Sequence, residues 1–191
     1  MTGLREKKKE QTRRRIAQSA VELLTTLRND QVTIAAIAEH AEVSARTFHN
    51  YFPTREAALF YFLQIVVDRW VENIRNSPAG LGPIDIMYRL IDDSTSKEPG
   101  DPFSFASLTR VIDHINYVTA CEDQTEAYDV VKRISDAICE RCPEHVSTID
   151  IHAMVNLAIA GGAIALKMTS LGPREAVLAA CFGIIRDGFS H

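Results

Sequence analysis

The stretch Val32–Arg55, VTIAAIAEHAEVSARTFHNYFPTR, decides the fold and predicts two short helices joined by a tight turn. In the first helix, apolar residues recur at i, i+3, i+4 and i+7, which is the pattern of one buried helical stripe. These positions are Ile34, Ile37, Ala38 and Ala41. Thr33 precedes the stripe and is a suitable N-cap, because its hydroxyl can accept a hydrogen bond from a free N–H of the first turn.

The second helix of this stretch is predicted over Ser44–Tyr51, after the turn Ala41-Glu42-Val43. Ser44 can cap it, and Pro53 and Thr54 mark its end and the cap of the next helix. The side chains left outward are short hydrogen-bonding groups, a cation and a ring, which are the types that bond base edges and phosphates. They are Arg46, Thr47, His49, Asn50 and Tyr51, whereas Val43, Phe48 and Phe52 point to the core.

This pattern, read over about residues 10–60, resembles the DNA-binding helix-turn-helix of the tetracycline-repressor (TetR) family of transcriptional regulators. The matching elements are Thr33, Ile37-Ala38, Ala41-x-Val43-Ser44, Thr47-Phe48, Tyr51-Phe52 and Arg55-Glu56-x-x-Leu59. Many members of that family have Gly where this chain has Glu42. If the turn residue needs a positive φ, Glu costs roughly 1 kcal/mol more than Gly.

The resemblance implies a helix-turn-helix domain over residues 1–53 and a ligand-binding and dimerisation domain over residues 54–191. It also implies the residues that bind double-stranded DNA. Those expected to face the major groove are Thr33, Ala45, Thr47, His49 and Asn50, beside the cap Ser44. Those expected to hold phosphates are Arg46, Tyr51 and Arg55, and Arg46 could instead read a guanine.

Charge is distributed unevenly along the 191 residues. Residues 1–60 hold ten Lys and Arg against seven Asp and Glu, whereas residues 61–191 hold eleven against eighteen. Residues 1–15 alone have a net charge of +5 and are expected to begin as a frayed arm. A basic start on an acidic chain favours a polyanion at one end, although a solvated charge run is the plainer alternative.

The remaining sequence predicts an all-α fold of about nine helices. Apolar periodicity and the Gly and Pro stops place the other helices at about 9–27, 54–76, 84–93, 103–120, 124–141, 147–170 and 173–189. No charge occurs over residues 153–166, but this run is judged too short to span a membrane. No signal peptide is visible and the four Cys suggest reduced thiols, so a cytoplasmic protein without membrane contact is expected.

The last two helices are rich in small residues, which fits either tight packing inside one subunit or a two-fold interface between two. The family resemblance favours the interface, and a palindromic operator would need it. The homodimer contacts are expected from Ile151, Val155, Ala158, Ile159, Gly162, Val177, Ala180, Cys181 and Ile184.

A pocket for a small-molecule effector is implied by the resemblance, not by spacing. Its candidate lining is Phe62, Trp70, Tyr88, Phe103, Phe105, His114, Asn116 and Tyr117, each of which is more readily explained as a core residue than as a ligand contact. A DNA-binding protein without an effector is a further alternative. The expected function is a ligand-released repressor that needs no cofactor and no metal.

A different class of function would use Cys139-x-x-Cys142 with His145 as a metal- or thiol-dependent sensor or enzyme. The remaining metal ligands are not evident, and His152 and Cys121 are candidates only by availability. Phosphate-binding glycine loops and hydrolase motifs are missing from the sequence, so we do not expect an enzyme.

Overall fold

The protein is all-α throughout the part of the chain that the structure describes. The computed structural model describes residues 2–98, 100–119, 125–141 and 147–188, which hold nine α-helices and two short 3-10 helices. In order they are α1 (Thr2–Thr26), η1 (Asn29–Gln31), α2 (Ile34–His40), α3 (Ala45–His49), α4 (Arg55–Arg75), α5 (Pro83–Thr95), α6 (Phe105–Thr119), α7 (Thr125–Cys139), α8 (Thr148–Lys167), η2 (Thr169–Leu171) and α9 (Arg174–Gly188). The predicted fold class is confirmed.

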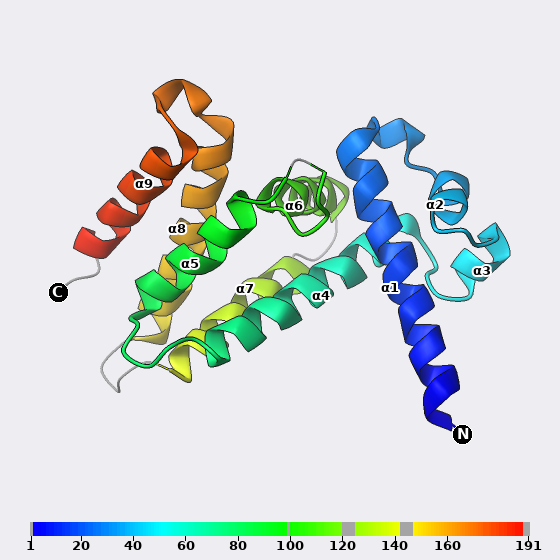
Figure 1. The fold of residues 1–191 in the computed structure, drawn as a ribbon, viewed down its shortest axis with the longest axis horizontal. Helices are drawn as coiled ribbons and strands as arrows, with labels where there is room; N and C mark the ends of the chain where they lie inside the picture. Colours follow the sequence, from blue (N-terminus) through cyan, green and yellow to red (C-terminus); the bar gives the residue numbers. More distant parts are fainter. Residues whose placement is uncertain (1, 99, 120–124, 142–146, 189–191) are drawn as a thin grey trace.

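The helices α1, α2 and α3 lie at one end of the molecule, and α4 leads from them towards the remaining helices (Figure 1). α1 packs against both α4 and α6, while α8 packs against α5, α7 and α9. A continuous set of buried apolar side chains runs through both ends and includes Phe48, Phe62 and Phe182. The predicted domain boundary after residue 53 stays a prediction, because α1 contacts helices on the far side of it.

The three predicted N-caps around the helix-turn-helix are confirmed. The hydroxyls of Thr33, Ser44 and Thr54 each accept a hydrogen bond from the backbone N–H three residues later, at 3.0 to 3.1 Å. Each cap satisfies one of the free N–H groups at its helix start and contributes about 1 kcal/mol. The caps therefore fix where α2, α3 and α4 begin.

The turn between α2 and α3 contains the one non-glycine residue with a positive φ among the described residues, Glu42 at +52°. The following N–H, of Val43, donates to the carbonyl of Ala38 at 2.8 Å and closes the turn. Glu42 therefore has the left-handed conformation that is considered above for this position. It costs about 1 kcal/mol more with Glu than with Gly.

The prediction that the basic start is frayed is wrong. α1 is helical from Thr2, seven residues before the predicted start at Lys9. Lys, Arg, Glu and Gln are good helix formers, and Glu10 accepts from Arg14 one turn later at 2.9 Å. The charges of residues 5–9 therefore lie along a helix.

The judgement that the apolar run in α8 is too short for a membrane also needs correction. α8 is 20 residues long and, by length and composition, could cross a membrane. The core helix of a soluble protein passes the same test, and α8 packs against four other helices, α5, α6, α7 and α9. That the protein makes no membrane contact stays a prediction.

Candidate nucleic-acid interface

The short helix α3 presents a polar surface because its apolar residues are used on the opposite side. Phe48 is fully buried, and its ring contacts that of Phe52 at 6.0 Å between centroids. Of the predicted outward set, Arg46, His49 and Asn50 are exposed, whereas Thr47 and Tyr51 are half-buried and Tyr51 packs against the core; Ala45, expected to face the major groove, is also exposed. Thr33 and Ser44 are also exposed, but their hydroxyls serve as caps of α2 and α3.

A groove of about 700 Å³ lies between this surface and the first turns of α1. Its α3 side consists of Thr47, Asn50 and Tyr51, and its α1 side consists of Arg5, Glu6, Lys8, Lys9 and Thr12. Three cations and one carboxylate give the groove a positive balance, and most of its other groups are hydrogen-bonding side chains. This combination suits a phosphate backbone running past α3.

Sequence reasoning assigned the basic residues of α1 to phosphate contact but placed them on a frayed arm. The helical spacing of Arg5, Lys8, Lys9 and Thr12 was the signal that could have placed them together, since residues three and four apart share a helix face. The structure adds that this face borders α3.

A contact between α1 and α4 holds that face in place. The Tyr61 hydroxyl donates to the Glu10 carboxylate at 2.5 Å. The Arg13 guanidinium lies 4.1 Å from the Tyr61 ring centroid and 5.4 Å from that of Phe52. The hydrogen bonds from Tyr61 and then Arg14 lower the pKa of Glu10 below its ordinary value, so its carboxylate is ionised at neutral pH.

Replacing Tyr61 by Phe removes the hydrogen bond to Glu10 and is expected to destabilise the protein by about 0.5–1 kcal/mol at pH 7. This loss is smaller than that expected for a buried hydrogen bond to a charged group, because Glu10 is half-exposed. The folded-state pKa of Glu10 is depressed, so its stabilisation is present above the ordinary pKa and is lost as the pH falls through the lowered value. Urea denaturation should therefore show the difference at pH 7 and a progressively smaller difference as the pH falls through the lowered pKa of Glu10.

Tyr88 is a matched control for this variant, because its ring packs edge-to-face on Phe182, far from α1. Tyr88→Phe should not reproduce the pH dependence. A loss of stability in Tyr61→Phe that does not change with pH would show that the contact with Glu10 is not its cause.

The predicted phosphate clamp Arg55 is directed into the protein and needs correction. Its Nη1 donates to the carbonyls of Asn29 and Val32, both at 2.9 Å, and its Nε donates to Glu56 at 2.9 Å. Its side chain is only 21% exposed. The two carbonyl partners are more than 20 residues away in sequence, so the helix pattern gave no sign of them. Arg55 joins the start of α4 to the segment that leads into α2.

The buried side chain of His114, from α6, also lies beside Arg55 and Glu56 at the start of α4. Its Nε2 lies 3.5 Å from both Arg55 Nη2 and Glu56 Oε1. Burial is the largest single influence on Glu56 and would raise its pKa, but the hydrogen bond and charge of Arg55, a backbone hydrogen bond and the hydrogen bond with His114 together outweigh it, so the pKa lies below the ordinary value. The junction is therefore a contact of ionised Glu56 with Arg55 and a buried imidazole.

The predicted effector-pocket residues are divided between the apolar core and a cleft at α6, and their role in an effector pocket stays a prediction. Phe62, Trp70 and Phe105 are buried among apolar side chains, and Phe62 contacts Phe103 at 5.0 Å between centroids. Tyr88 and Phe103 are half-buried against the same core. His114 lines a separate cleft, and the side chains of Asn116 and Tyr117 lie outside the described residues.

The predicted dimer contacts need correction because most are buried within the subunit. The buried ones are Ile151, Val155, Ala158, Gly162 and Val177; Ile159 and Cys181 are half-buried, and Ala180 and Ile184 are exposed. A helix that is apolar on all sides gives no sequence signal for which side faces its own core. The α8 stripe that the prediction chose packs inward.

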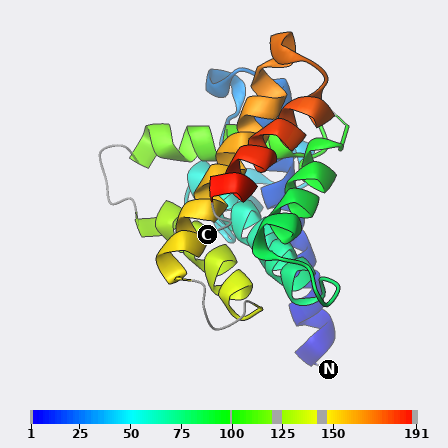
Figure 2. The ribbon, with the colours of Figure 1, turned by 90° about the vertical axis from the view of Figure 1, so that its left-hand side faces the viewer.

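The helices α8 and α9 lie towards the viewer in Figure 2. The side chains of α8 and α9 that remain exposed include a different apolar set, which we call the α8–α9 face. Its largest side chains are Leu157 at 48%, Ile164 at 39% and Ile184 at 75% exposure. Ile149, Ala153, Ala160, Ala176 and Ala180 complete it. No Asp, Glu, Lys or Arg occurs between Asp150 and Lys167.

The cysteine hypothesis receives little support from the described residues. Cys139 is half-buried, and burial raises the pKa of its thiol, which lowers the thiolate fraction that binds metals. Cys121, Cys142 and His145 lie outside the described residues. Within the ranges that the structure describes, no group of three or more His, Cys, Asp or Glu could hold a metal.

The capped helix pair and its groove define a helix-turn-helix protein. Residues 16–60 match the model of the bacterial regulatory proteins of the tetR family. The chain is 29% identical over 85 residues to the regulator TcmR of Streptomyces glaucescens and 25% identical over 129 residues to the repressor KstR of Rhodococcus jostii (strain RHA1). The aligned parts are 44% and 68% of this chain. They cover 38% and 58% of the two relatives, so the chain spans about half of their length.

The whole fold is also shared with solved structures. Thermus thermophilus FadR, a TetR-family transcriptional repressor in complex with lauroyl-CoA, superposes with a TM-score of 0.59 at 20% identity. The superposition covers 93% of this chain and 94% of that one. Over residues 16–60 the chain therefore carries the helix-turn-helix domain of the bacterial regulatory proteins of the tetR family.

Proposed function

We propose that this protein is a sequence-specific DNA-binding transcriptional repressor. In this proposal it binds a palindromic operator as a homodimer and is released by a small-molecule effector. The observation that carries the proposal is the groove in which three cations of α1 border Thr47 of α3 and the residues that follow this helix, Asn50 and Tyr51. Family membership and a cytoplasmic, non-enzymatic role are consistent with it.

The residue roles follow from exposure and chemistry. Ala45, His49 and Asn50 are exposed on α3 and would face base edges, with Thr47 beside them and Thr33 at the start of α2. Arg46 and Tyr51 would bind phosphates together with the cations of α1. Arg55 instead would hold the helix-turn-helix at its angle to α4, since its guanidinium donates to Asn29 and Val32.

The experiment that tests the proposal is selection of bound sequences from a random DNA pool at near-physiological salt. Enrichment of a two-fold palindrome is the expected result, because a dimer presents two α3 helices to half-sites about one helical turn apart. A population with no shared sequence, held only by salt-sensitive binding, would contradict specific recognition.

Replacing Lys8 and Lys9 together by Gln is expected to weaken binding of all DNA sequences and to lower the slope of log K against log salt by about 2, since each phosphate contact contributes about 0.9. The selected sequence should stay the same. Fluorescence anisotropy over a range of salt concentrations measures both effects.

The matched control neutralises Lys97 and Lys132, which lie at the end of α5 and on α7. That double variant removes the same charge far from the groove, so its salt slope should equal that of the wild type. If both double variants lower the slope equally, overall charge and not the groove is responsible.

For the second subunit we propose the α8–α9 face as the contact. Three features support a second copy of this chain as its occupant. The face is apolar, α8 has no Asp, Glu, Lys or Arg between Asp150 and Lys167 near its two ends, and the face lies at the opposite end of the molecule from α3 (Figure 1). Two copies joined there about a two-fold axis would leave both α3 helices free to bind DNA.

The effector is proposed to be a small organic molecule that binds a form of the dimer with altered α3 spacing more tightly than the DNA-bound form. The FadR structure holds lauroyl-CoA, and RolR of the same fold, with a TM-score of 0.50, holds resorcinol. These are ligands of those proteins. For this chain they support the class of a small molecule and not its identity.

A further inference from the structure

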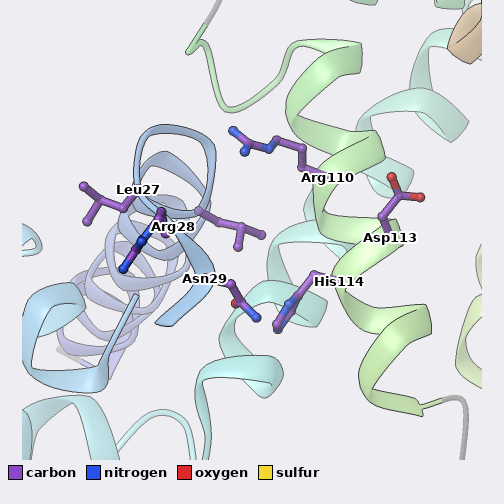
Figure 3. A pocket seen from close by; sticks show the side chains of 7 residues that line it. Leu27, Arg28, Asn29, Arg110, Asp113 and His114 are labelled. Atoms are coloured by element: carbon purple, nitrogen blue, oxygen red, sulfur yellow. The ribbon is translucent and has the colours of Figure 1, made fainter. Parts of the chain in front are cut away.

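A cleft of about 330 Å³ separates the end of α1 from α6. One wall consists of Leu24, Leu27, Arg28 and Asn29, and the other of Arg110, Asp113 and His114 (Figure 3). Arg110 and His114 project from α6 towards the segment that carries Arg28 and Asn29 (Figure 3). The volume is at the lower end of the range for small-molecule sites, about 300–1,000 Å³.

We propose that this cleft binds a small anion with a short apolar tail, whose head is a carboxylate or a phosphate. The donors in its lining are the Arg110 guanidinium and the Asn29 amide, and His114 adds an imidazole whose Nε2 lies 3.5 Å from Arg55 Nη2 and from Glu56 Oε1. One Arg110 N–H is used by the carbonyl of Thr25, which fixes the side chain across the gap and leaves further N–H groups. Leu24 and Leu27 provide apolar surface for the tail.

The charges around the cleft favour an anion over a cation. Arg28 and Arg110 contribute two positive charges, while Asp113 is the one carboxylate of the lining. Asp113 is 66% exposed and lies 3.6 Å from Lys167, so it sits at the rim and is partly compensated. Arg28 is paired with Asp30 at 3.0 Å, but its side chain is 78% exposed and can turn to a ligand. The pattern of donors therefore matches one anionic head group.

An occupied cleft would also act on the helix-turn-helix, a step that rests on the proposed DNA-binding function. His114 lines the cleft and contacts Arg55, and Arg55 donates to the carbonyl of Asn29, which is on the opposite wall. A ligand that draws Asn29 and His114 together would change the angle between the α2–α3 pair and α6. Binding to the cleft itself can be measured without DNA, so the two proposals fail separately.

The test uses the full-length protein without DNA and three probes with the same tail: hexanoate, hexyl phosphate and hexanol. Two-dimensional ¹H–¹⁵N NMR follows the side-chain signals of Asn29 and Arg110. Saturable shifts with hexanoate, hexyl phosphate or both, but not with hexanol, are expected. The stronger anion shows whether a carboxylate or a phosphate is preferred. Equal shifts with hexanol, or none with any probe, would overturn the proposal.

Variants separate the cleft from general charge effects. Arg110→Ala should weaken the better anion at least tenfold, whereas Arg89→Ala, an exposed arginine of α5, should leave its affinity unchanged. The Asp113→Asn protein should bind the preferred anionic probe about two- to threefold more tightly at low salt, because a negative charge near the probe is removed. A gain cannot come from misfolding, so an unchanged or weaker affinity in Asp113→Asn counts against the site even if Arg110→Ala is unstable.

Discussion

Replacing Leu157 by Glu is expected to convert the proposed dimer to a monomer and to weaken binding of the proposed operator by at least about a hundredfold, because joining two half-site contacts in one molecule contributes about 10²–10⁴ in affinity. Leu157 lies near the middle of the exposed α8 stripe and is 48% exposed in the single subunit. The new carboxylate would stay in water in the monomer. In the dimer it would be buried in an apolar surface without a partner, and twice because of the two-fold symmetry.

Sedimentation equilibrium and anisotropy with the selected operator measure the two effects. Ala106→Glu is the matched control, since Ala106 is exposed in the first turn of α6 and lies outside the α8–α9 face. This control should remain dimeric and bind DNA normally. A Leu157→Glu protein that is still a dimer with full affinity would mean that the subunits meet elsewhere.

Replacing Gly162 by Val is expected to lower stability by about 3 kcal/mol, which corresponds to a fall in Tm of about 6–12 °C for a chain of this size. A Cβ at Gly162 would lie 2.7 Å from Ile91 Cγ2 and 2.8 Å from Phe105 Cζ. These contacts join α8 to α5 and α6, so the added side chain would force the helices apart or its neighbours out of their rotamers.

Gly183 of α9 is the control, because a Cβ there meets nothing within 4 Å in the subunit. Both substitutions are best compared in the Leu157→Glu background, where subunit contact does not enter. Gly183→Val should change stability by less than about 0.5 kcal/mol, since Val and Gly differ little in helix propensity. Equal destabilisation at both positions would show that the close packing at Gly162 is not the cause.

Features set by neighbours in sequence could be predicted. The caps at Thr33, Ser44 and Thr54 depend on a hydroxyl and an N–H three residues later, so the pattern contains all that is needed. The burial of Phe48 and the exposure of Arg46, His49 and Asn50 follow from helical spacing alone.

Features that depend on contacts between residues far apart in the sequence could not be predicted. Arg55 finds its carbonyl partners at Asn29 and Val32, and only the folded chain brings them within reach. The length of α1 was missed because a charge run is compatible with both coil and helix until Tyr61 of α4 holds Glu10. The inward side of α8 was misassigned because its apolar residues surround the whole helix.

The helix α1 touches α6 at one end, where Arg110 donates to the Thr25 carbonyl, and borders the DNA-facing groove at the other, where Arg5 lies. At about 1.5 Å per residue, these points are roughly 30 Å apart along a single stiff rod. A tilt of about five degrees at the α6 end would move the far end by between about two and three ångströms. Such a displacement is comparable to the length of a hydrogen bond. Under the proposed DNA-binding function, α1 would act as a lever that converts a slight rearrangement beside α6 into the gain or loss of a phosphate contact at Arg5.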